Sequence, residues 1–283
     1  MLQQTFNEFE IVISDNDPEG SARQPSMSFS DPRVKYFDNG ENLGMIASFN
    51  KSIERATGTF IVMVTDDDPV DLGMLSAMHH LYVQRPGFSL YAGFLRSTTS
   101  HGEIEVISSK QFLAQLLHPK RTPWFLWSSC VVEREAAMAI GCIPDYGSPH
   151  LADHAFLALA GSVRGGVILN KSFSALNVHD QNFSKFNFEY YVNGCSGFFK
   201  TLASGGAEQR DIAVVRKHLY TWFITVIFNL KKYYTATKPN EQSLRQIDNC
   251  AEIILRMPFM QNVIPRYRVK SAIFRIKRLL HLL

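Results

Sequence analysis

The chain has 283 residues, of which 46% are hydrophobic and 19% are charged, and its formal net charge is +3. This balance excludes a disordered or fibrous chain and fits one large domain, or a core domain with an appendage. A charge this small gives no reason to expect nucleic acid as a partner.

The four cysteines are widely spaced, and no C-x-x-C pair occurs. The sequence therefore predicts neither a zinc cluster nor a disulfide framework, and a reducing cytoplasm is the expected setting. The first residues lack the basic start and apolar core of a signal peptide. The longest apolar stretch, around residues 222–230, is shorter than the roughly 20 residues that a membrane-spanning helix needs.

The apolar pattern of the first half predicts alternating strands and helices. Strands are expected over 9–14, 34–37, 59–65, 89–95, 124–132 and 165–169, and helices over 42–57, 72–84, 111–118, 133–140 and 152–160. The run 59–65 is continuously apolar, which is typical of a strand buried on both faces of a parallel sheet. This alternation predicts a layered α/β fold.

From about residue 186 the pattern becomes helical, with long helices expected over 210–234 and 242–257. Residues 266–283 form a basic amphipathic helix with no acidic side chain. Such a helix lies either on an anionic membrane or on the protein itself, as a cover of the core or an oligomer contact. Both interpretations remain open at this point.

Three adjacent carboxylates, Asp66, Asp67 and Asp68, begin where the predicted strand 59–65 ends, and ligands of open α/β sheets bind at such strand ends. Neighbouring carboxylates repel one another, so a protein retains them mainly where a cation or hydrogen-bond donors compensate. Strand geometry sends Asp66 and Asp68 to one side, where they suit a ribose and a Mg²⁺ or Mn²⁺ ion, and Asp67 to the other. A solvated acidic loop is the alternative.

Two single residues are further candidates. His179 follows the predicted strand 165–169, and a neutral imidazole is a common ligand of divalent ions, although a lone histidine is more often structural. Asp153 lies at a predicted helix N-terminus, where the helix dipole stabilises a carboxylate. It is either an ordinary first-turn acid or a general base that accepts a proton from an attacking hydroxyl.

Six segments resemble, in order, those of the family 2 glycosyltransferases, which have the GT-A fold. They are Glu10–Asn16, the Asn42-Leu43-Gly44 to Ala56-Thr57-Gly58 segment, Asp66-Asp67-Asp68 as the D-x-D motif, Ser128–Glu135 with Gly141, Leu151-Ala152-Asp153, and Val178-His179 with Ser184. No single segment is specific to the family. Their shared order and spacing indicate it over residues 3–185.

The resemblance implies a GT-A-type, Rossmann-like sandwich with a mixed, mainly parallel central sheet, followed by a helical C-terminal extension. It places a glycosyltransferase domain over 1–185 and a helical region over 186–283. Within the first domain, residues 1–100 form the nucleotide-sugar half and 101–185 the acceptor half.

The resemblance also implies roles for individual residues. Nucleotide-sugar contacts fall to Asp15, Asn42, Asp66 and Asp67, metal ligation to Asp68, Asp66 and His179, and catalysis to Asp153. The implied reaction is an inverting transfer, dependent on Mn²⁺ or Mg²⁺, from a nucleoside-diphosphate sugar to a hydroxyl of a glycan or lipid-linked acceptor. The expected process is bacterial surface-polysaccharide synthesis, in the cytoplasm or at the inner face of the cell membrane through residues 265–283.

The sequence departs from the family pattern at three points. The strand and helix that normally precede the segment at residues 2–6 are absent, which predicts an exposed sheet edge and an open nucleotide pocket. Phe49 stands where many members have arginine, and Ala152 replaces the acid before the predicted base. The alternative function is therefore a non-catalytic or truncated module that only binds a nucleotide sugar.

Overall fold

The computed structural model describes residues 1–65, 68–94, 103–121, 126–177, 182–204, 209–280 and 282. The chain divides into two compact units. The first comprises Met1–Leu116, Pro123–Asp145 and Ala152–Asn177, and the second Leu117–Thr122, Tyr146–Leu151 and Val178–Leu283. The second unit thus takes up two short segments from the middle of the chain, which no local pattern indicates. The expected division at residue 185 stays a prediction.

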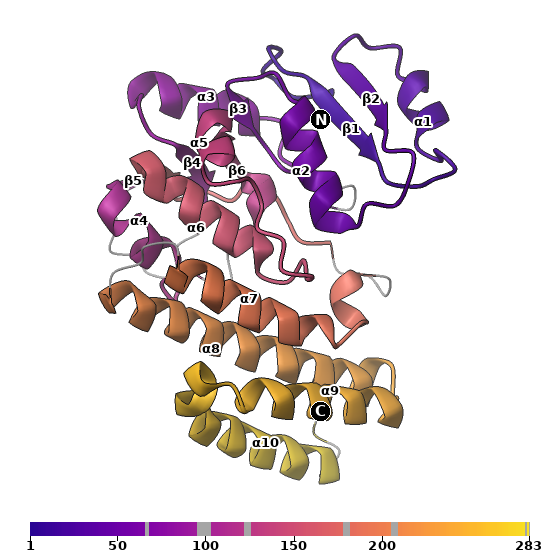
Figure 1. Ribbon diagram of the computed structural model, residues 1–283, viewed down its shortest axis with the longest axis vertical. Helices are drawn as coiled ribbons and strands as arrows, with labels where there is room; N and C mark the ends of the chain where they lie inside the picture. Colours follow the sequence, from indigo (N-terminus) through magenta and orange to yellow (C-terminus); the bar gives the residue numbers. More distant parts are fainter. Residues whose placement is uncertain are drawn as a thin grey trace. The chain divides into compact units, whose positions relative to one another are not determined.

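The first unit contains two sheets and six helices among its described residues (Figure 1). The strands are β1 (Ile11–Asp15), β2 (Val34–Asp38), β3 (Phe60–Ile61), β4 (Leu90–Gly93), β5 (Ile104–Ile107), β6 (Cys130–Glu133) and β7 (Gly166–Leu169). The helices are α1 (Arg23–Ser28), α2 (Met45–Arg55), α3 (Met74–Gln84), α4 (Ser109–Leu116), α5 (Arg134–Ala139) and α6 (Ala152–Arg164). The predicted α/β alternation is confirmed, whereas α1 and β5 were not predicted.

The five-stranded central sheet is mixed, as expected, but the expectation that it is mainly parallel is wrong. The five-stranded sheet has the order β3-β6-β4-β7-β5, and only its β4–β7 pair is parallel among the described strands. β1 and β2 form a separate parallel pair. The difference arises because β6 runs antiparallel to β3 and β4, and β5 runs antiparallel to β7.

The apolar run 59–65 forms far less strand than its composition predicts. Only Phe60 and Ile61 belong to β3, which pairs with β6 on one edge among the described residues. Ile61 is buried, while residues 62–65 are half-buried and outside the ladder. A strand buried on both faces needs a neighbour on each edge, and among the described residues β3 has a ladder partner on one edge. The exposed sheet edge that the sequence predicts stays a prediction.

The core of the first unit lies on both faces of the five-stranded sheet. On one face, Met74 and Met78 of α3 pack on Tyr91, Val131 and Val167, which come from β4, β6 and β7. The opposite face carries Leu90, Ala92, Val132 and Ile168, all buried, and α6 packs on β4 and β6. The period of two in these strands therefore divides their side chains between two helical layers.

Helices α4 and α6 approach closely because α6 has a glycine at the crossing. A Cβ atom at Gly161 would lie within the van der Waals envelope of the Phe112 ring, which is fully buried. Phe112 therefore occupies the space that a side chain at position 161 would need.

We expect Gly161→Ala to lower the free energy of unfolding by about 1–3 kcal/mol, since overpacking displaces the Phe112 ring. The better helix propensity of alanine, worth about 1 kcal/mol, offsets part of this cost. Urea unfolding checks the change. In a Phe112→Ala background the same substitution should cost less, and an equal cost in both backgrounds would contradict this explanation.

The second unit is helical, as the sequence predicts. It contains α7 (Tyr190–Ser204), α8 (Gln209–Lys232) continued by a π-helical turn (Tyr233–Thr237), α9 (Glu241–Leu255) and α10 (Ile264–Leu279), with 3₁₀ turns at Phe183–Lys185 and Pro258–Val263. Figure 1 shows α7 to α10 as successive layers, coloured orange to yellow.

The segment Tyr146–Leu151 joins the second unit through specific contacts with α7. The His150 ring stacks on Tyr191 at 3.9 Å between centroids, and the Ser148 hydroxyl donates to the Tyr190 carbonyl over 2.8 Å. Burial lowers the pKa of His150 to about 4, so its ring is neutral at physiological pH. An uncharged, stacked imidazole packs as an aromatic side chain, which explains how a histidine is accommodated there.

In the described part of the chain, no helix is long and apolar enough to cross a membrane. Cys130, Cys142, Cys195 and Cys250 are buried free thiols.

Candidate active site

The carboxyl ends of the central strands are tied together beyond the sheet itself. The segment after β3 pairs antiparallel with the segment after β7 through a bridge between Val70 and Ser174. The Asp71 amide donates to the Phe173 carbonyl over 2.7 Å, and the Ala175 amide donates to the Pro69 carbonyl over 3.2 Å. Two chain segments about a hundred residues apart therefore meet where the sequence predicts a ligand site.

Asp68 lies at this junction. Its Oδ1 atom accepts a hydrogen bond from the backbone N–H of Asn177 over 3.0 Å. Asn177 stands two positions before His179 in the sequence. The structure thus brings Asp68 to the chain segment that leads into the second predicted metal ligand, while His179 itself lies outside the described residues, as do Asp66 and Asp67.

The amino end of β6 reaches the same edge, because β6 runs antiparallel to β3 and β4. The Ser129 and Ser174 hydroxyls share a 2.6 Å hydrogen bond, and Ser129 Oγ also accepts from the Phe173 amide over 3.3 Å. Next along the chain, burial raises the pKa of the Cys130 thiol, and the Asp153 carboxylate adds to this effect. Asp153 therefore acts electrostatically on the first residue of β6, the strand on which α6 packs.

Asp153 occupies the first turn of α6, as predicted, but it is not an ordinary helix-capping acid. The Asp153 side chain keeps 30% of its surface exposed. Burial nevertheless raises the pKa of Asp153 to about 6, although hydrogen bonds from the backbone N–H groups of His154 and Asp153 favour the ionised form. His154 Nε2 lies 3.8 Å away, and burial lowers the pKa of His154 to about 3, so no ion pair stabilises the carboxylate there at neutral pH. An accessible carboxyl with a pKa near neutrality can exchange protons with a ligand.

Asp15 ends β1 and is buried, with its oxygens used by its own loop. Burial opposes ionisation, but hydrogen bonds from the Tyr36 hydroxyl (2.8 Å) and the backbone N–H groups of Asp17 and Ala22 (3.1 Å each) outweigh it and lower the pKa of Asp15. The structure thus gives Asp15 a role in shaping residues 15–22. Its predicted contact with a nucleotide stays a prediction.

Asn42 belongs to a polar network between β1 and α2. Its Oδ1 atom accepts from Asn16 Nδ2 over 2.8 Å and from the Gly44 amide over 2.9 Å. Arg55 donates to Ser14 Oγ over 2.8 Å and lies farther along the same network. Asn42 is exposed, and a nucleotide contact by Asn42 remains a prediction.

Glu10 connects the two sheets of the first unit, a role that the sequence analysis did not assign. Its Oε1 accepts from the Thr57 and Gly58 amides over 2.5 and 3.2 Å, and its Oε2 lies 2.5 Å from Lys35 Nζ. Burial opposes ionisation, but these donors hold the pKa of Glu10 at about 2. The amino ends of β1 and β3 are thereby fixed together, so Asp15 and Asp68 both follow strands that start from one point. A single acidic residue before a strand gives no sequence signal that it connects two strands in this way.

The described residues fit a divalent ion in part. Asp68 makes no ion pair within the described chain, and the nearby Thr65 hydroxyl is a buried oxygen without a hydrogen-bond partner. A carboxylate and a hydroxyl are the hard oxygen donors that Mg²⁺ and Mn²⁺ prefer. Within the described ranges no three His, Cys, Asp or Glu side chains are grouped as for a metal.

The fold defines the class of protein. TarS from S. aureus (residues 1–349, in complex with UDP-GlcNAc) matches with a TM-score of 0.61 and 14% identity, over 90% of this chain and 75% of that one. The mannosyltransferase PcManGT from Pyrobaculum calidifontis, in complex with GDP-Man and Mn²⁺, matches with a TM-score of 0.54 and 15% identity, over 95% and 80%. At these identities the likeness shows the fold alone, which is the GT-A type.

The sequence comparison supplies the family. Residues 1–123 match the family described as Glycosyl transferase family 2. A curated relative, the Escherichia coli UDP-Glc:alpha-D-GlcNAc-diphosphoundecaprenol beta-1,3-glucosyltransferase WfgD, is 31% identical over 68 residues. That match covers 24% of this chain and spans 27% of the relative's length.

The family resemblance inferred from the sequence is thus confirmed over residues 1–123. Asp15, Asn42 and the three aspartates at 66–68 fall within the matched range. Asp153 and His179 lie beyond it, and their roles stay predictions.

The raised pKa of Asp153 predicts a pH-dependent cost to stability. Because the folded-state pKa of about 6 exceeds the ordinary 3.8, the folded protein holds the proton more tightly, and its stability falls as pH rises from about 4 to about 6. We expect Asp153→Asn to be more stable than the parent by about 1–3 kcal/mol at pH 8 and equal to it below pH 4. Urea unfolding over this pH range measures the difference.

Glu135→Gln is the matched control, because Glu135 is an exposed acid in the first turn of α5. It should show no comparable pH-dependent difference. An Asp153→Asn variant that is less stable than the parent at pH 8 would contradict the assignment of a costly, accessible carboxylate.

Proposed function

We propose that the protein is an inverting, metal-dependent glycosyltransferase of bacterial surface-polysaccharide synthesis. It moves a sugar from a nucleoside-diphosphate donor to a hydroxyl of a glycan or lipid-linked acceptor, in the cytoplasm at the inner face of the cell membrane. The observation that carries the proposal is the pKa of Asp153, raised to about 6 in the first turn of α6, a helix that packs on the same GT-A sheet whose strand ends carry Asp68.

The relatives support the chemical class of donor and acceptor. The structures of TarS and PcManGT are complexes with UDP-GlcNAc and with GDP-Man and Mn²⁺, and WfgD is named for transfer from UDP-Glc to a diphosphoundecaprenol-linked sugar. PcManGT and WfgD are named as transferases with a nucleoside-diphosphate sugar, and TarS is in complex with one. A donor of this class is therefore our proposal for this chain too, with the particular sugar left open.

Asp153 is the proposed general base. Its carboxylate accepts the proton of the acceptor hydroxyl while the hydroxyl oxygen forms a bond to C1 of the donor sugar. The bond from C1 to the diphosphate breaks at the same time, so the nucleoside diphosphate leaves from the opposite face and the configuration at C1 inverts. A base with a pKa of about 6 is ionised at neutral pH and still basic enough to help this transfer.

Asp68, together with Asp66 and His179, is proposed to hold the divalent ion. A bound Mg²⁺ or Mn²⁺ supplies positive charge that compensates the negative charge on the departing diphosphate. The backbone N–H of Asn177 fixes one Asp68 oxygen, Oδ1. Asp15, Asn42, Asp66 and Asp67 are the proposed contacts to the nucleotide sugar.

A non-catalytic module that binds nucleotide sugar is the second candidate. Two features favour it: residues 62–65 are half-buried, and β3 pairs with a strand on one edge within the described chain. The sheet beside the aspartates is therefore incomplete among the described residues. The two candidates differ in a simple way, since only an enzyme transfers or hydrolyses the donor sugar.

The first test concerns the base. With UDP-glucose, UDP-GlcNAc or GDP-mannose and Mn²⁺, the parent should release nucleoside diphosphate at a rate that rises with pH through an apparent pKa near 6. Asp153→Asn should lower that rate by about 10²–10⁴-fold without weakening donor binding. Equal rates in parent and variant would remove Asp153 as the base, and no turnover with intact donor binding would favour the non-catalytic module.

The second test concerns the metal. Asp68→Asn retains an oxygen that can accept from the Asn177 amide but removes the charge, so we expect loss of Mn²⁺-dependent donor binding in calorimetry with an unchanged melting temperature. Asp71→Asn is the matched control, because Asp71 is exposed and its carboxylate accepts from the Gly73 amide over 2.7 Å. Manganese dependence that survives in Asp68→Asn would show that Asp68 is not a ligand.

A further inference from the structure

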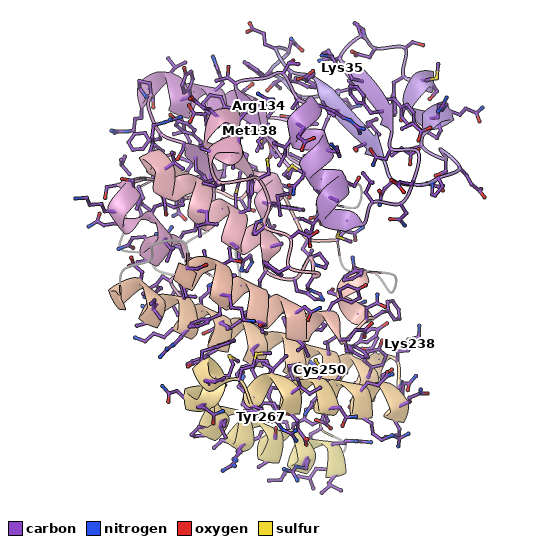
Figure 2. All side chains as sticks on the ribbon, viewed as in Figure 1. Lys35, Arg134, Met138, Lys238, Cys250 and Tyr267 are labelled. Carbon is purple, nitrogen blue, oxygen red and sulfur yellow. The ribbon has the colours of Figure 1, made fainter. Side chains whose placement is uncertain are left out.

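Helix α10 (Ile264–Leu279) is attached to the second unit by one face only. The Tyr267 and Phe274 rings lie 5.7 and 6.1 Å from the Phe228 ring of α8. The Lys231 ammonium donates to the Tyr267 hydroxyl over 3.2 Å. Figure 2 labels Tyr267 on the side of α10 that faces the neighbouring helices. These contacts fix which face of α10 points outward.

The outward face carries a continuous apolar stripe, Val269, Ile273, Ile276 and Leu280. Their exposed fractions are 60%, 48%, 56% and 60%. Their spacing of four, three and four residues places them on one side of a helix, opposite Tyr267 and Phe274. Single exposed apolar side chains are ordinary on a protein surface, but a contiguous stripe of branched ones marks an interaction surface.

Cationic side chains line both sides of this stripe. Helical periodicity places Arg266, Lys270 and Lys277 along one side, and Arg268 and Arg275 along the other. All five are exposed. α10 contains no acidic residue, so within the helix nothing neutralises these charges.

We propose that α10 is a membrane-surface helix that binds anionic phospholipid. The apolar stripe enters the boundary between headgroups and acyl chains, to a depth of about 5–10 Å, and the flanking cations contact lipid phosphates. The 16 residues of α10 are too few to span a bilayer, so the helix lies parallel to the surface. This deepens and rests on the membrane location proposed above, but vesicle binding needs neither donor nor metal and is tested separately.

The charge pattern favours a lipid surface over a second copy of the chain. A two-fold contact through the stripe would place the same patch against itself, and so bring the cations of the two helices together. Like charges brought together in this way disfavour association. An anionic bilayer instead offers an apolar layer and negative charge at the depths where α10 presents apolar and positive groups.

The test is flotation of the full chain with vesicles of phosphatidylcholine alone or mixed with phosphatidylglycerol. We expect binding to the mixed vesicles that weakens at high salt, and little binding to phosphatidylcholine. Ile273→Asn with Ile276→Asn should weaken binding about tenfold or more. Lys270→Glu with Lys277→Glu should do the same, while circular dichroism shows an unchanged fold.

Matched controls lie in the first unit. Val83→Asn changes an equally exposed apolar side chain, and Lys110→Glu reverses an exposed cation elsewhere. Both should bind vesicles as the parent does. A parent that does not float, or stripe variants that float like the parent, would overturn the proposal. Self-association of the parent in ultracentrifugation that is lost in the stripe variants, without vesicle binding, would assign the face to a second copy instead.

Discussion

The pairing of the segment after β3 with the segment after β7 is the constraint on which the candidate site depends. Neither segment belongs to a long strand, and backbone hydrogen bonds hold them together beyond the sheet. Unpaired backbone N–H and C=O groups are costly where they are buried, and Phe173 in this pairing is buried. Because the pairing satisfies them, Asp68 is placed beside Asn177 and the Ser129–Ser174 contact brings in the start of β6.

The carboxylates of the first unit divide into two physical kinds. Glu10 and Asp15 are surrounded by donors that outweigh burial, so their charges are compensated internally and hold the fold together. Asp153 has too few donors to compensate its burial, and its pKa is raised. An uncompensated acid costs stability, which a protein tolerates where a ligand or a reaction uses the group.

The family match over residues 1–123 explains why the aspartates lie at the end of an apolar run. The same region also shows the largest departure from a continuous sheet, since β1 and β2 pair only with each other among the described strands. Glu10 bridges this gap through the Thr57 and Gly58 amides. The Glu10 carboxylate thus supplies part of the connection that a shared ladder of backbone hydrogen bonds would provide.

The sequence by itself determined the α/β alternation, the helical second half, the family over residues 1–123 and the amphipathic character of the last helix. Each depends on local periodicity or on short motifs, which neighbouring residues suffice to encode. Tertiary structure alone decided the strand directions, the short extent of β3 and the transfer of Tyr146–Leu151 to the second unit. It also decided the Asp68–Asn177 contact, the raised pKa of Asp153 and which face of α10 points outward. These features depend on groups that are distant in the sequence, and burial and hydrogen bonding between such groups exist only once the chain has folded.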